Sequence, residues 1–403
     1  MKVPLTSNGL RNKDIVAAIK VLKSGKLTIG SNVKLFEKSM AKYLGVKHFI
    51  MVNSGSSANL AIIEALLRPT FGKPLLKAGD GVIVPAIAWP TTIWPLLQLG
   101  LKPFFVDVNL ENLSLNLEKA RELIEHSENR IRAIFPIHPL GFGINHNDLK
   151  VISSKYDLIV INDVCESLGS WNGDIHAGTQ GVAGTFSFYF SHHLTTMEGG
   201  GIATQSDAIA DDLRSIRSHG WSRDRFDKVK VEKRIDVSRQ KYLFVTTGFN
   251  IRPMEIQAAI GISQLKNLDK FIDRRRSIVE RVADALRGKK MFVIGEEYLR
   301  DSFEYKRHSW MLLPIRIHLN NPKIRAEVVS SLEKFGIENR PVLTGNFLNQ
   351  PALRHLQNRP NSSLFRNAQI IENSSFLVSC HHDLTDKQVK YLIDRLLIIE
   401  KQL

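Results

Sequence analysis

The feature that most constrains the fold is a regular alternation of short β-rich runs and helical periods between Lys47 and Asp163. The strand-like runs are residues 48–53, 81–85, 102–108, 131–138 and 158–163, and the helical periods are 58–67, 91–99 and 116–125. This alternation is typical of βαβ units. We therefore expect an α/β fold with a mixed, mostly parallel sheet flanked by helices on both faces.

The pattern changes after Met254. It predicts helices up to Leu286, a strand over 310–318, a helix over 322–335, a strand over 337–342 and a final helix from Asp386. We interpret residues 1–255 as a large α/β domain and residues 256–403 as a smaller C-terminal α+β domain. Two more strand-like runs, 184–190 and 200–205, flank a polar connection that contains adjacent histidines.

Charge limits the kinds of partner. The 403 residues include 55 Lys and Arg against 40 Asp and Glu, a formal net charge of +15, which suits nucleic acid, a membrane surface or a small phosphorylated substrate. Many of these cations lie in a basic segment, Arg214–Lys241, which charge patterning interprets either as a solvated, mobile loop or as a segment that orders over a nucleotide diphosphate.

The sequence lacks features that would indicate a membrane, a secretion route or a metal site. No apolar run approaches the ~20 residues of a membrane span, and the first residues lack a signal peptide, so we expect a cytoplasmic protein with no membrane partner. The two cysteines, Cys165 and Cys380, are too few for an iron–sulfur cluster or a cysteine-rich zinc site. We predict no metal centre.

Three segments contain candidate functional residues. The run 53–59 (NSGSSAN) joins a strand to a helix and is either a phosphate-binding helix start or a serine-capped turn. Asp163 ends a hydrophobic strand, so it either faces a ligand crevice, where it would pair with a protonated ring nitrogen, or caps a helix. His192 and His193 are either proton-transfer groups or structural residues.

Several segments, taken in order, resemble the DegT/DnrJ/StrS sugar aminotransferase family, whose members have the fold-type I architecture of pyridoxal-phosphate-dependent transferases. The resemblance extends over nearly the whole chain, and it is carried by residues 22–30, 43–48, 53–57, 163, 185–188, 198–200 and 248–252. It implies a cofactor, pyridoxal or pyridoxamine 5′-phosphate, and a nucleotide-linked sugar as substrate.

The resemblance also implies residue roles. The phosphate would be held by Gly55, Ser56, Ser57, Ser187 and, from the neighbouring subunit, Asn250. Trp89 would stack on the cofactor ring; the alternative is that it is a core residue. Asp163 would pair with the ring nitrogen, and Glu166 would lie near the ring hydroxyl. Because Asn250 acts across an interface, a homodimer with shared active sites is implied.

One departure from the family pattern changes the expected reaction. Aminotransferases of this family carry a lysine a few residues before Glu-Gly-Gly that binds the cofactor covalently, but no lysine occurs between Lys155 and Lys228. The segment around His192 and His193 is instead similar to the subgroup that dehydrates nucleotide-linked 4-keto-6-deoxyhexoses at C3. Imidazole transfers protons but forms no stable imine, so the cofactor would be held noncovalently.

The chain is more similar to the GDP-linked type of this subgroup, with GDP-4-keto-6-deoxymannose as substrate and L-glutamate as amino donor, and the shared features are residues 218–221, 250–253, 255, 340–342 and 344–347. The CDP-linked type contains an iron–sulfur cluster, for which two cysteines are too few. Counted from Ser187 and Glu198, the lysine position of the family falls on His192, so the resemblance implies that His192 transfers the proton, with His193 as the alternative. Only one of two neighbouring side chains faces the cofactor if the segment is extended. His219, Arg252 and Arg340 are assigned to the substrate, with a surface salt bridge as the alternative for Arg340.

Three other hypotheses stay open at this point. They are a nucleotide-sugar aminotransferase that uses another base, a catalytically inactive cofactor-binding regulator, and a basic nucleic-acid-binding protein. We rank all three lower, since the lysine is absent, an inactive scaffold does not need paired histidines, and the sequence contains no recognisable DNA-binding motif.

Overall fold

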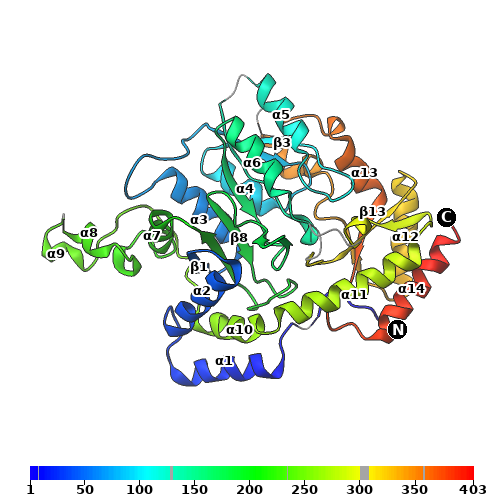
Figure 1. Ribbon diagram of the computed structural model, residues 1–403, viewed down its shortest axis with the longest axis horizontal. Coiled ribbons are helices and arrows are strands. Elements are labelled where there is room, and N and C mark those ends of the chain that lie inside the picture. Colours follow the sequence, from blue (N-terminus) through cyan, green and yellow to red (C-terminus); the bar gives the residue numbers. More distant parts are fainter. Residues whose placement is uncertain (8, 128–129, 234, 300–307, 357–358) are drawn as a thin grey trace.

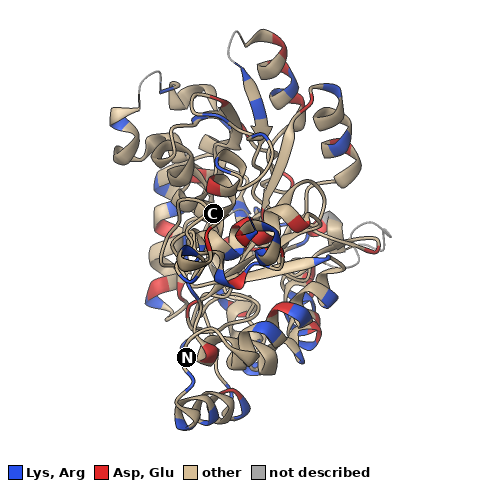
Figure 2. Ribbon diagram, turned by 90° about the vertical axis from the view of Figure 1, so that its left-hand side faces the viewer, with Lys and Arg blue, Asp and Glu red and all other residues tan. Residues whose placement is uncertain are grey.

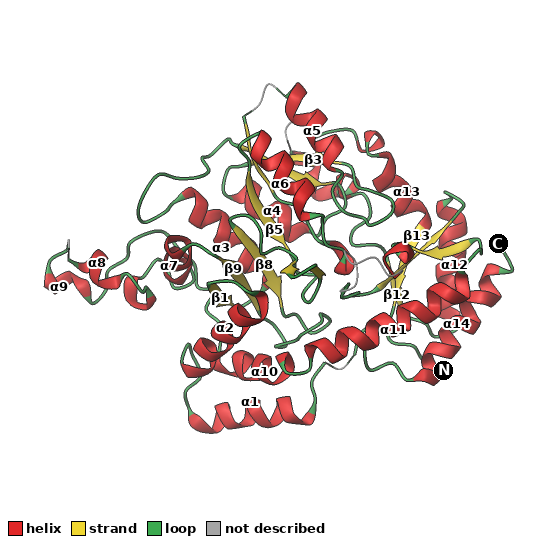
Figure 3. Cartoon of the chain, viewed as in Figure 1, coloured by secondary structure: helices red, strands yellow, loops and turns green. Residues whose placement is uncertain are grey.

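The structure is a computed structural model that describes residues 1–7, 9–127, 130–233, 235–299, 308–356 and 359–403. Its centre is a seven-stranded sheet with helices on both faces (Figures 1 and 3). In spatial order the strands are β1 (His48–Val52), β9 (Gly200–Thr204), β8 (Ala183–Ser187), β5 (Ile159–Asp163), β4 (Ile131–Ile134), β2 (Gly81–Pro85) and β3 (Lys102–Val106). Only β9 runs antiparallel to its neighbours β1 and β8. The predicted mixed, mostly parallel sheet is confirmed.

Strand side chains alternate between two hydrophobic layers, as the pleat requires. In β1, Ile50 and Val52 pack in the layer that includes α3 (Gly55–Leu67), α4 (Pro90–Gln98) and α7 (Asp207–Ile216). Phe49 and Met51 pack in the opposite layer with α2 (Ser31–Leu44) and α10 (Glu255–Leu265). At the other half of the sheet this opposite face is covered by α5 (Leu117–His126) and α6 (His146–Lys155).

A second sheet lies toward the C-terminus. Its four antiparallel strands have the order β10 (Met291–Val293), β11 (Leu313–Ile317), β13 (Ser375–Val378) and β12 (Asn339–Arg340). The accompanying helices are α11 (Leu268–Leu286), α12 (Pro322–Lys334), α13 (Arg366–Ser374) and α14 (Asp386–Glu400). One hydrophobic cluster is continuous from the large sheet into this region. Val3 pairs with Ile337, so the first residues of the chain contact the C-terminal part, and the domain division at residue 255 stays a prediction.

Most predicted elements of the large sheet agree with the structure to within a few residues, but some elements were missed. The clearest omission is α6, which begins after Asn145, whose side chain accepts bonds from the amides of Asn147 and Asp148. Helices α1 (Asn12–Ser24), α2 and α13 and strands β10 and β13 were not predicted either. No helix in the described part of the chain is long and apolar enough to cross a membrane.

The basic segment is more ordered than the charge pattern predicted. It contains the end of α7 and two short helices, α8 (Lys228–Glu232) and α9 (Val237–Gln240), which project from the body of the protein (Figure 1). Arg217 is buried and pairs with Glu37 at 2.6 Å, and buried Arg225 pairs with Asp212 at 2.9 Å. The interpretation as a solvated loop was therefore wrong for the first part of the segment, which contains Arg217 and Arg225. Arg234 lies outside the described residues.

We expect the buried histidines to make the fold acid-sensitive. Burial lowers the pKa of His138 and His381 to about 4 and that of His176 and His308 to about 3. Below pH 6.5 the unfolded chain therefore binds more protons than the folded one, and stability present above this pH is lost as the pH falls. Each such histidine contributes a slope of up to about 1.4 kcal/mol per pH unit.

Urea titrations between pH 7.5 and 4.5 measure this slope directly. The free energy of unfolding should fall over the whole interval, and replacing exposed His126 by glutamine should leave the slope unchanged. A stability profile that is flat across these pH values would contradict the prediction.

Candidate active site

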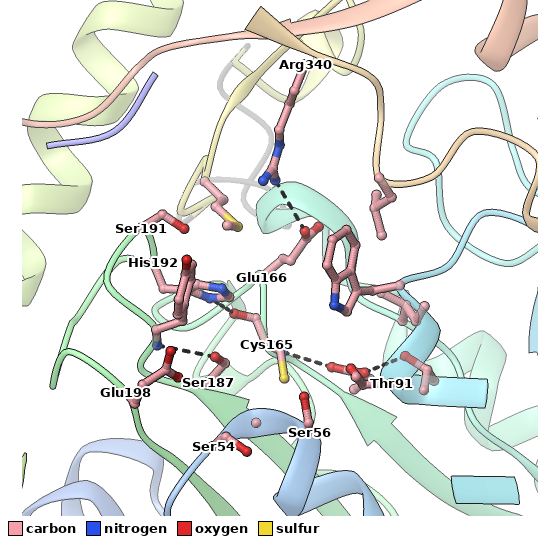
Figure 4. Close-up of a pocket in the computed structure, with 18 residues that line it drawn as sticks. Ser54, Ser56, Thr91, Cys165, Glu166, Ser187, Ser191, His192, Glu198 and Arg340 are labelled. Carbon is pink, nitrogen blue, oxygen red and sulfur yellow. Dashed lines mark hydrogen bonds and ion pairs between the residues drawn. The ribbon is translucent and has the colours of Figure 1, made fainter. Parts of the chain in front are cut away.

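A cavity of about 460 Å³ opens at the carboxyl edge of the large sheet (Figure 4). Its walls come from the connections that follow β1, β2, β4, β5 and β8, which end at this edge because those strands are parallel. Ligands bind at this edge in open α/β sheets. The C-terminal region closes the cavity with Met311, Arg340 and Leu343.

One end of the cavity is the start of α3. Ser54 caps the helix, because its hydroxyl oxygen accepts the amide of Ser57 at 3.1 Å. The amides of Gly55 and Ser56 lie in the first turn, where the helix offers them no acceptor, and they are available to an anion. Ser57 does not line the cavity, and its hydroxyl oxygen accepts a bond from Ser54 at 3.0 Å.

Two glycines make this helix start accessible. A Cβ atom at Gly55 would lie 2.7 Å from Cβ of Ser187 and 2.9 Å from Sγ of Cys165. A Cβ atom at Gly200 would lie 2.3 Å from the carbonyl carbon of Ser54. Glycine at both positions lets β8, β9 and the helix start approach closely, and it brings Ser187 to the anion site.

A carboxylate lies on the floor of the cavity. Asp163 ends β5 and is only 4% exposed. Its Oδ2 accepts hydrogen bonds from Nδ2 of Asn59 at 2.8 Å and from the hydroxyl of Thr92 at 2.7 Å, and its Oδ1 accepts the amide of Cys165 at 3.1 Å. Among the described residues no lysine or arginine forms an ion pair with it.

The two adjacent histidines lie in different surroundings. His192 lines the cavity, and its Nδ1 lies 2.6 Å from the carbonyl oxygen of Cys165. Because a carbonyl only accepts, Nδ1 carries the proton and Nε2 is left as a proton acceptor. Burial lowers the pKa of His192 to about 4, against the opposing effect of the Cys165 bond, so the ring is neutral at pH 7. His193 does not line the cavity and is buried, at 1% exposure.

Glu166 and Arg340 form the upper wall in Figure 4. Oε2 of Glu166 accepts the amide of Leu140 at 3.0 Å, and Oε1 lies 3.8 Å from the Arg340 guanidinium. Burial raises the pKa of Glu166, while Arg340 and the amide oppose the rise. Arg340 faces the cavity and is not a surface ion pair alone.

The remaining predicted residues divide into two groups. Trp89 lines the cavity and is 52% exposed, so it is not a core residue. His219, Asn250 and Arg252 do not line the cavity of their own chain, and Nε of Arg252 donates to Oδ1 of Asn250 at 3.0 Å. Asn250 is exposed.

Sequence reasoning did not single out several residues of the site. The cavity is also lined by Thr91, Thr92, Ile137, Tyr189 and Ser191, and by Ser54 and Glu198, which sequence reasoning included only as members of the runs 53–59 and 198–200. Asn59 lies behind this lining and reaches Asp163. For most of them the only available signal was their position just after a predicted strand, which indicates the edge of the sheet without indicating a contact.

The cavity fits the expected cofactor. It offers an anion site at a helix start, a buried carboxylate for a ring nitrogen, and an aromatic side chain that can cover a planar ring. Together with the sheet order, these features define a protein of the fold-type I aminotransferase class.

The chain belongs to the DegT/DnrJ/EryC1/StrS aminotransferase family, whose profile matches residues 9–397. It is 36% identical over 393 residues to the GDP-4-keto-6-deoxy-D-mannose 3-dehydratase of Yersinia pseudotuberculosis, covering 97% of each chain. Two crystal structures of GDP-4-keto-6-deoxymannose-3-dehydratase match at 36% identity and a TM-score of 0.88, with 98% of this chain and 100% of theirs covered. One is a histidine-to-asparagine mutant with bound GDP-perosamine, and the other holds a trapped PLP-glutamate geminal diamine.

Proposed function

We propose that this protein is a pyridoxal/pyridoxamine-phosphate-dependent 3-dehydratase. It removes the C3 hydroxyl of a nucleotide-linked 4-keto-6-deoxyhexose, GDP-4-keto-6-deoxymannose, and yields a 4-keto-3,6-dideoxy sugar, with L-glutamate restoring the aminated cofactor. The observation that carries the proposal is the identity of the base. Among the described residues no lysine lines the cavity, whereas His192 presents a neutral imidazole to it.

Each part of the cavity has its own task. Gly55, Ser56 and Ser187 hold the phosphate, Asp163 faces the ring nitrogen, and Trp89 covers the ring. When bound, the cofactor supplies an electron sink next to the sugar. His192 accepts and returns a proton through Nε2 while its Nδ1–H stays bonded to Cys165, and the cofactor is held without a covalent bond and without an iron–sulfur cluster.

The relatives support the substrate and the amino donor. The structure with GDP-perosamine indicates that this kind of protein accommodates a GDP-linked deoxysugar, and the geminal diamine indicates that it accepts glutamate. We also propose that the protein is cytoplasmic and that neither nucleic acid nor a membrane is its partner.

Charge supports a homodimer with shared active sites. The cavity lining contains three carboxylates, Asp163, Glu166 and Glu198, but only one guanidinium, Arg340. The proposed ligands carry a phosphate and a pyrophosphate, so the described lining lacks cations. Lys and Arg are interspersed with Asp and Glu over the chain (Figure 2), but the projecting basic segment has exposed cations that include Lys233, Arg239 and Lys241. We propose that this segment and Asn250 reach the site of the other subunit.

Mixed dimers test this sharing. If Asn250 serves the neighbouring site, a His192→Asn chain and an Asn250→Ala chain should each be inactive alone. Their 1:1 mixture after subunit exchange should regain about a quarter of wild-type activity, because half of the dimers contain one intact site. The matched control places both substitutions in one chain and mixes it 1:1 with wild-type chains. The mixed dimers then contain no intact site if the sites are shared, so about a quarter of wild-type activity should remain, against about a half if each site uses its own Asn250. Failure to regain activity in the first mixture would contradict shared sites.

The proposed function is tested by absorbance. Purified protein with pyridoxal phosphate should show an aldehyde band that L-glutamate converts to a pyridoxamine band. Absence of any bound cofactor band would overturn the proposal at its first step. If GDP-4-keto-6-deoxymannose is then added, a stable 4-amino sugar as the product would establish an aminotransferase instead.

A further inference from the structure

We infer that Asn59, Thr92 and Thr185 are positioning residues that hold the Asp163 carboxylate in one orientation, with one oxygen turned toward the cofactor. The inference rests on the proposed function, since it assigns these residues to the cofactor's ring nitrogen. All three side chains are completely buried, at 0% exposure, in a protein whose polar side chains are mostly at the surface.

The two oxygens of Asp163 are held differently. Oδ2 receives two side-chain donors, Asn59 at 2.8 Å and Thr92 at 2.7 Å. Oδ1 accepts the amide of Cys165 at 3.1 Å, and the Cys165 thiol is a further hydrogen-bond partner of the carboxylate. Rotation of the carboxylate would break the contacts at Oδ2, so Oδ1 remains the oxygen with capacity for a further donor. Asp163 lines the cavity, where that donor would be the ring nitrogen of the cofactor.

Thr185 supports the direction in which the Asn59 amide points. Its hydroxyl donates to Oδ1 of Asn59 at 2.6 Å, and the carbonyl oxygen of Asn162 is a second, longer acceptor at 3.2 Å. The amide nitrogen of Asn59 faces Asp163, and the carbonyl oxygen of Thr91, which accepts from the same nitrogen at 3.1 Å, favours the same direction. In the reversed amide, a carbonyl oxygen would face the carboxylate, which is repulsive unless the carboxylate is protonated. Thr185 thus acts on Asp163 through Asn59.

Neutral hydrogen-bond donors are better suited than a cation to orient the Asp163 carboxylate toward the cofactor. They favour the charged carboxylate without neutralising it. A lysine or arginine at the same place would compete with the protonated ring nitrogen for Asp163. The three residues come from α3, α4 and β8, so the sheet and both helices fix the carboxylate together.

The experiment compares Thr92→Val, which removes the donor but keeps the shape, with Thr92→Ser, which keeps the donor. Thr185→Val tests the relay through Asn59. The matched control is Thr204→Val, because Thr204 is also buried and donates to the backbone, at Val182, but lies outside the network. Two quantities are measured: the dissociation constant of pyridoxal phosphate, and the pH at which the absorbance of the bound cofactor changes as its ring nitrogen loses its proton.

We expect Thr92→Val and Thr185→Val to weaken cofactor binding about tenfold or more and to lower that pH midpoint by about one unit. Thr92→Ser and Thr204→Val should stay within about threefold of wild type. The inference is overturned if folded Thr92→Val and Thr185→Val proteins, checked by circular dichroism, show the wild-type midpoint.

Crystal structures without cofactor give a second measure that does not depend on the proposed function. In Thr185→Val the Asn59 amide or the Asp163 carboxylate should turn away from its wild-type orientation, and an unchanged pair would contradict the inference. If the wild-type protein binds no pyridoxal phosphate, the proposed function fails, while this structural comparison still decides whether the network orients Asp163.

Discussion

Replacing His192 by asparagine should reduce dehydration by about 10³-fold while the protein still binds pyridoxal phosphate. General acid–base groups typically contribute about 10²–10⁴-fold to a rate. Among the described residues that line the cavity, His192 is the only imidazole, and its proton-accepting Nε2 is set by the 2.6 Å contact of Nδ1 with Cys165. Asparagine keeps a polar group of smaller size but cannot accept and return a proton at neutral pH. Single-turnover release of dideoxy sugar measures the loss.

The neighbouring histidine provides the matched control. His193 is buried and outside the cavity, so His193→Asn should lower stability while the rate per folded molecule stays within about threefold of wild type. If His193→Asn loses the rate and His192→Asn retains it, the assignment of the two histidines is reversed.

Replacing Asp163 by asparagine should have an effect of similar size, but on the cofactor itself. The change removes the negative charge that would face the protonated ring nitrogen. At about 4 Å and an effective dielectric constant of about 20, two unit charges interact by about 4 kcal/mol, which corresponds to about 10³-fold in affinity or rate. Equilibrium dialysis gives the affinity, and the absorbance of the bound cofactor reports the ring nitrogen.

Glu198→Gln is the control for Asp163→Asn, because Glu198 also lines the cavity but is exposed to solvent, where charge interactions are weak. It should change cofactor affinity by less than about tenfold. Equal losses in both variants would mean that overall cavity charge, and not a specific partner for the ring nitrogen, governs binding.

Much of the large sheet was predictable because its signals are local. Short β-branched runs between helical periods predict parallel strands, and the carboxyl ends of parallel strands meet at one edge. Gly55 and Asp163 each lie at or just after the end of such a run, so the pattern alone places them at the same edge. Ser187 lies inside the predicted run 184–190, and only the structure shows that β8 ends there. Helix α6 was missed because only Leu149 and Ile152 of its side chains are buried, which is too weak a hydrophobic period to recognise.

The contacts that could not be predicted join residues that are far apart in the sequence. Thr185 and Asn59 are 126 residues apart, and Thr92 and Asp163 are 71 apart, so no local pattern announces their hydrogen bonds. The first part of the basic segment was misinterpreted for the same reason, since Glu37, the partner of Arg217, lies 180 residues away in the sequence. The roles of Trp89, Glu166 and Arg340 came from the family resemblance, and periodicity alone would not have identified them.

The most direct test of the proposed dehydration is the mass of the sugar product. Protein, pyridoxal phosphate, L-glutamate and GDP-4-keto-6-deoxymannose are incubated together, and the nucleotide sugar is analysed by mass spectrometry. We predict a GDP-sugar that has lost one oxygen atom and retains no nitrogen from glutamate, with ammonia and 2-oxoglutarate formed alongside it. A GDP-sugar that keeps its C3 oxygen and gains an amino group, or an unchanged substrate in the presence of bound cofactor, would contradict the proposed dehydration.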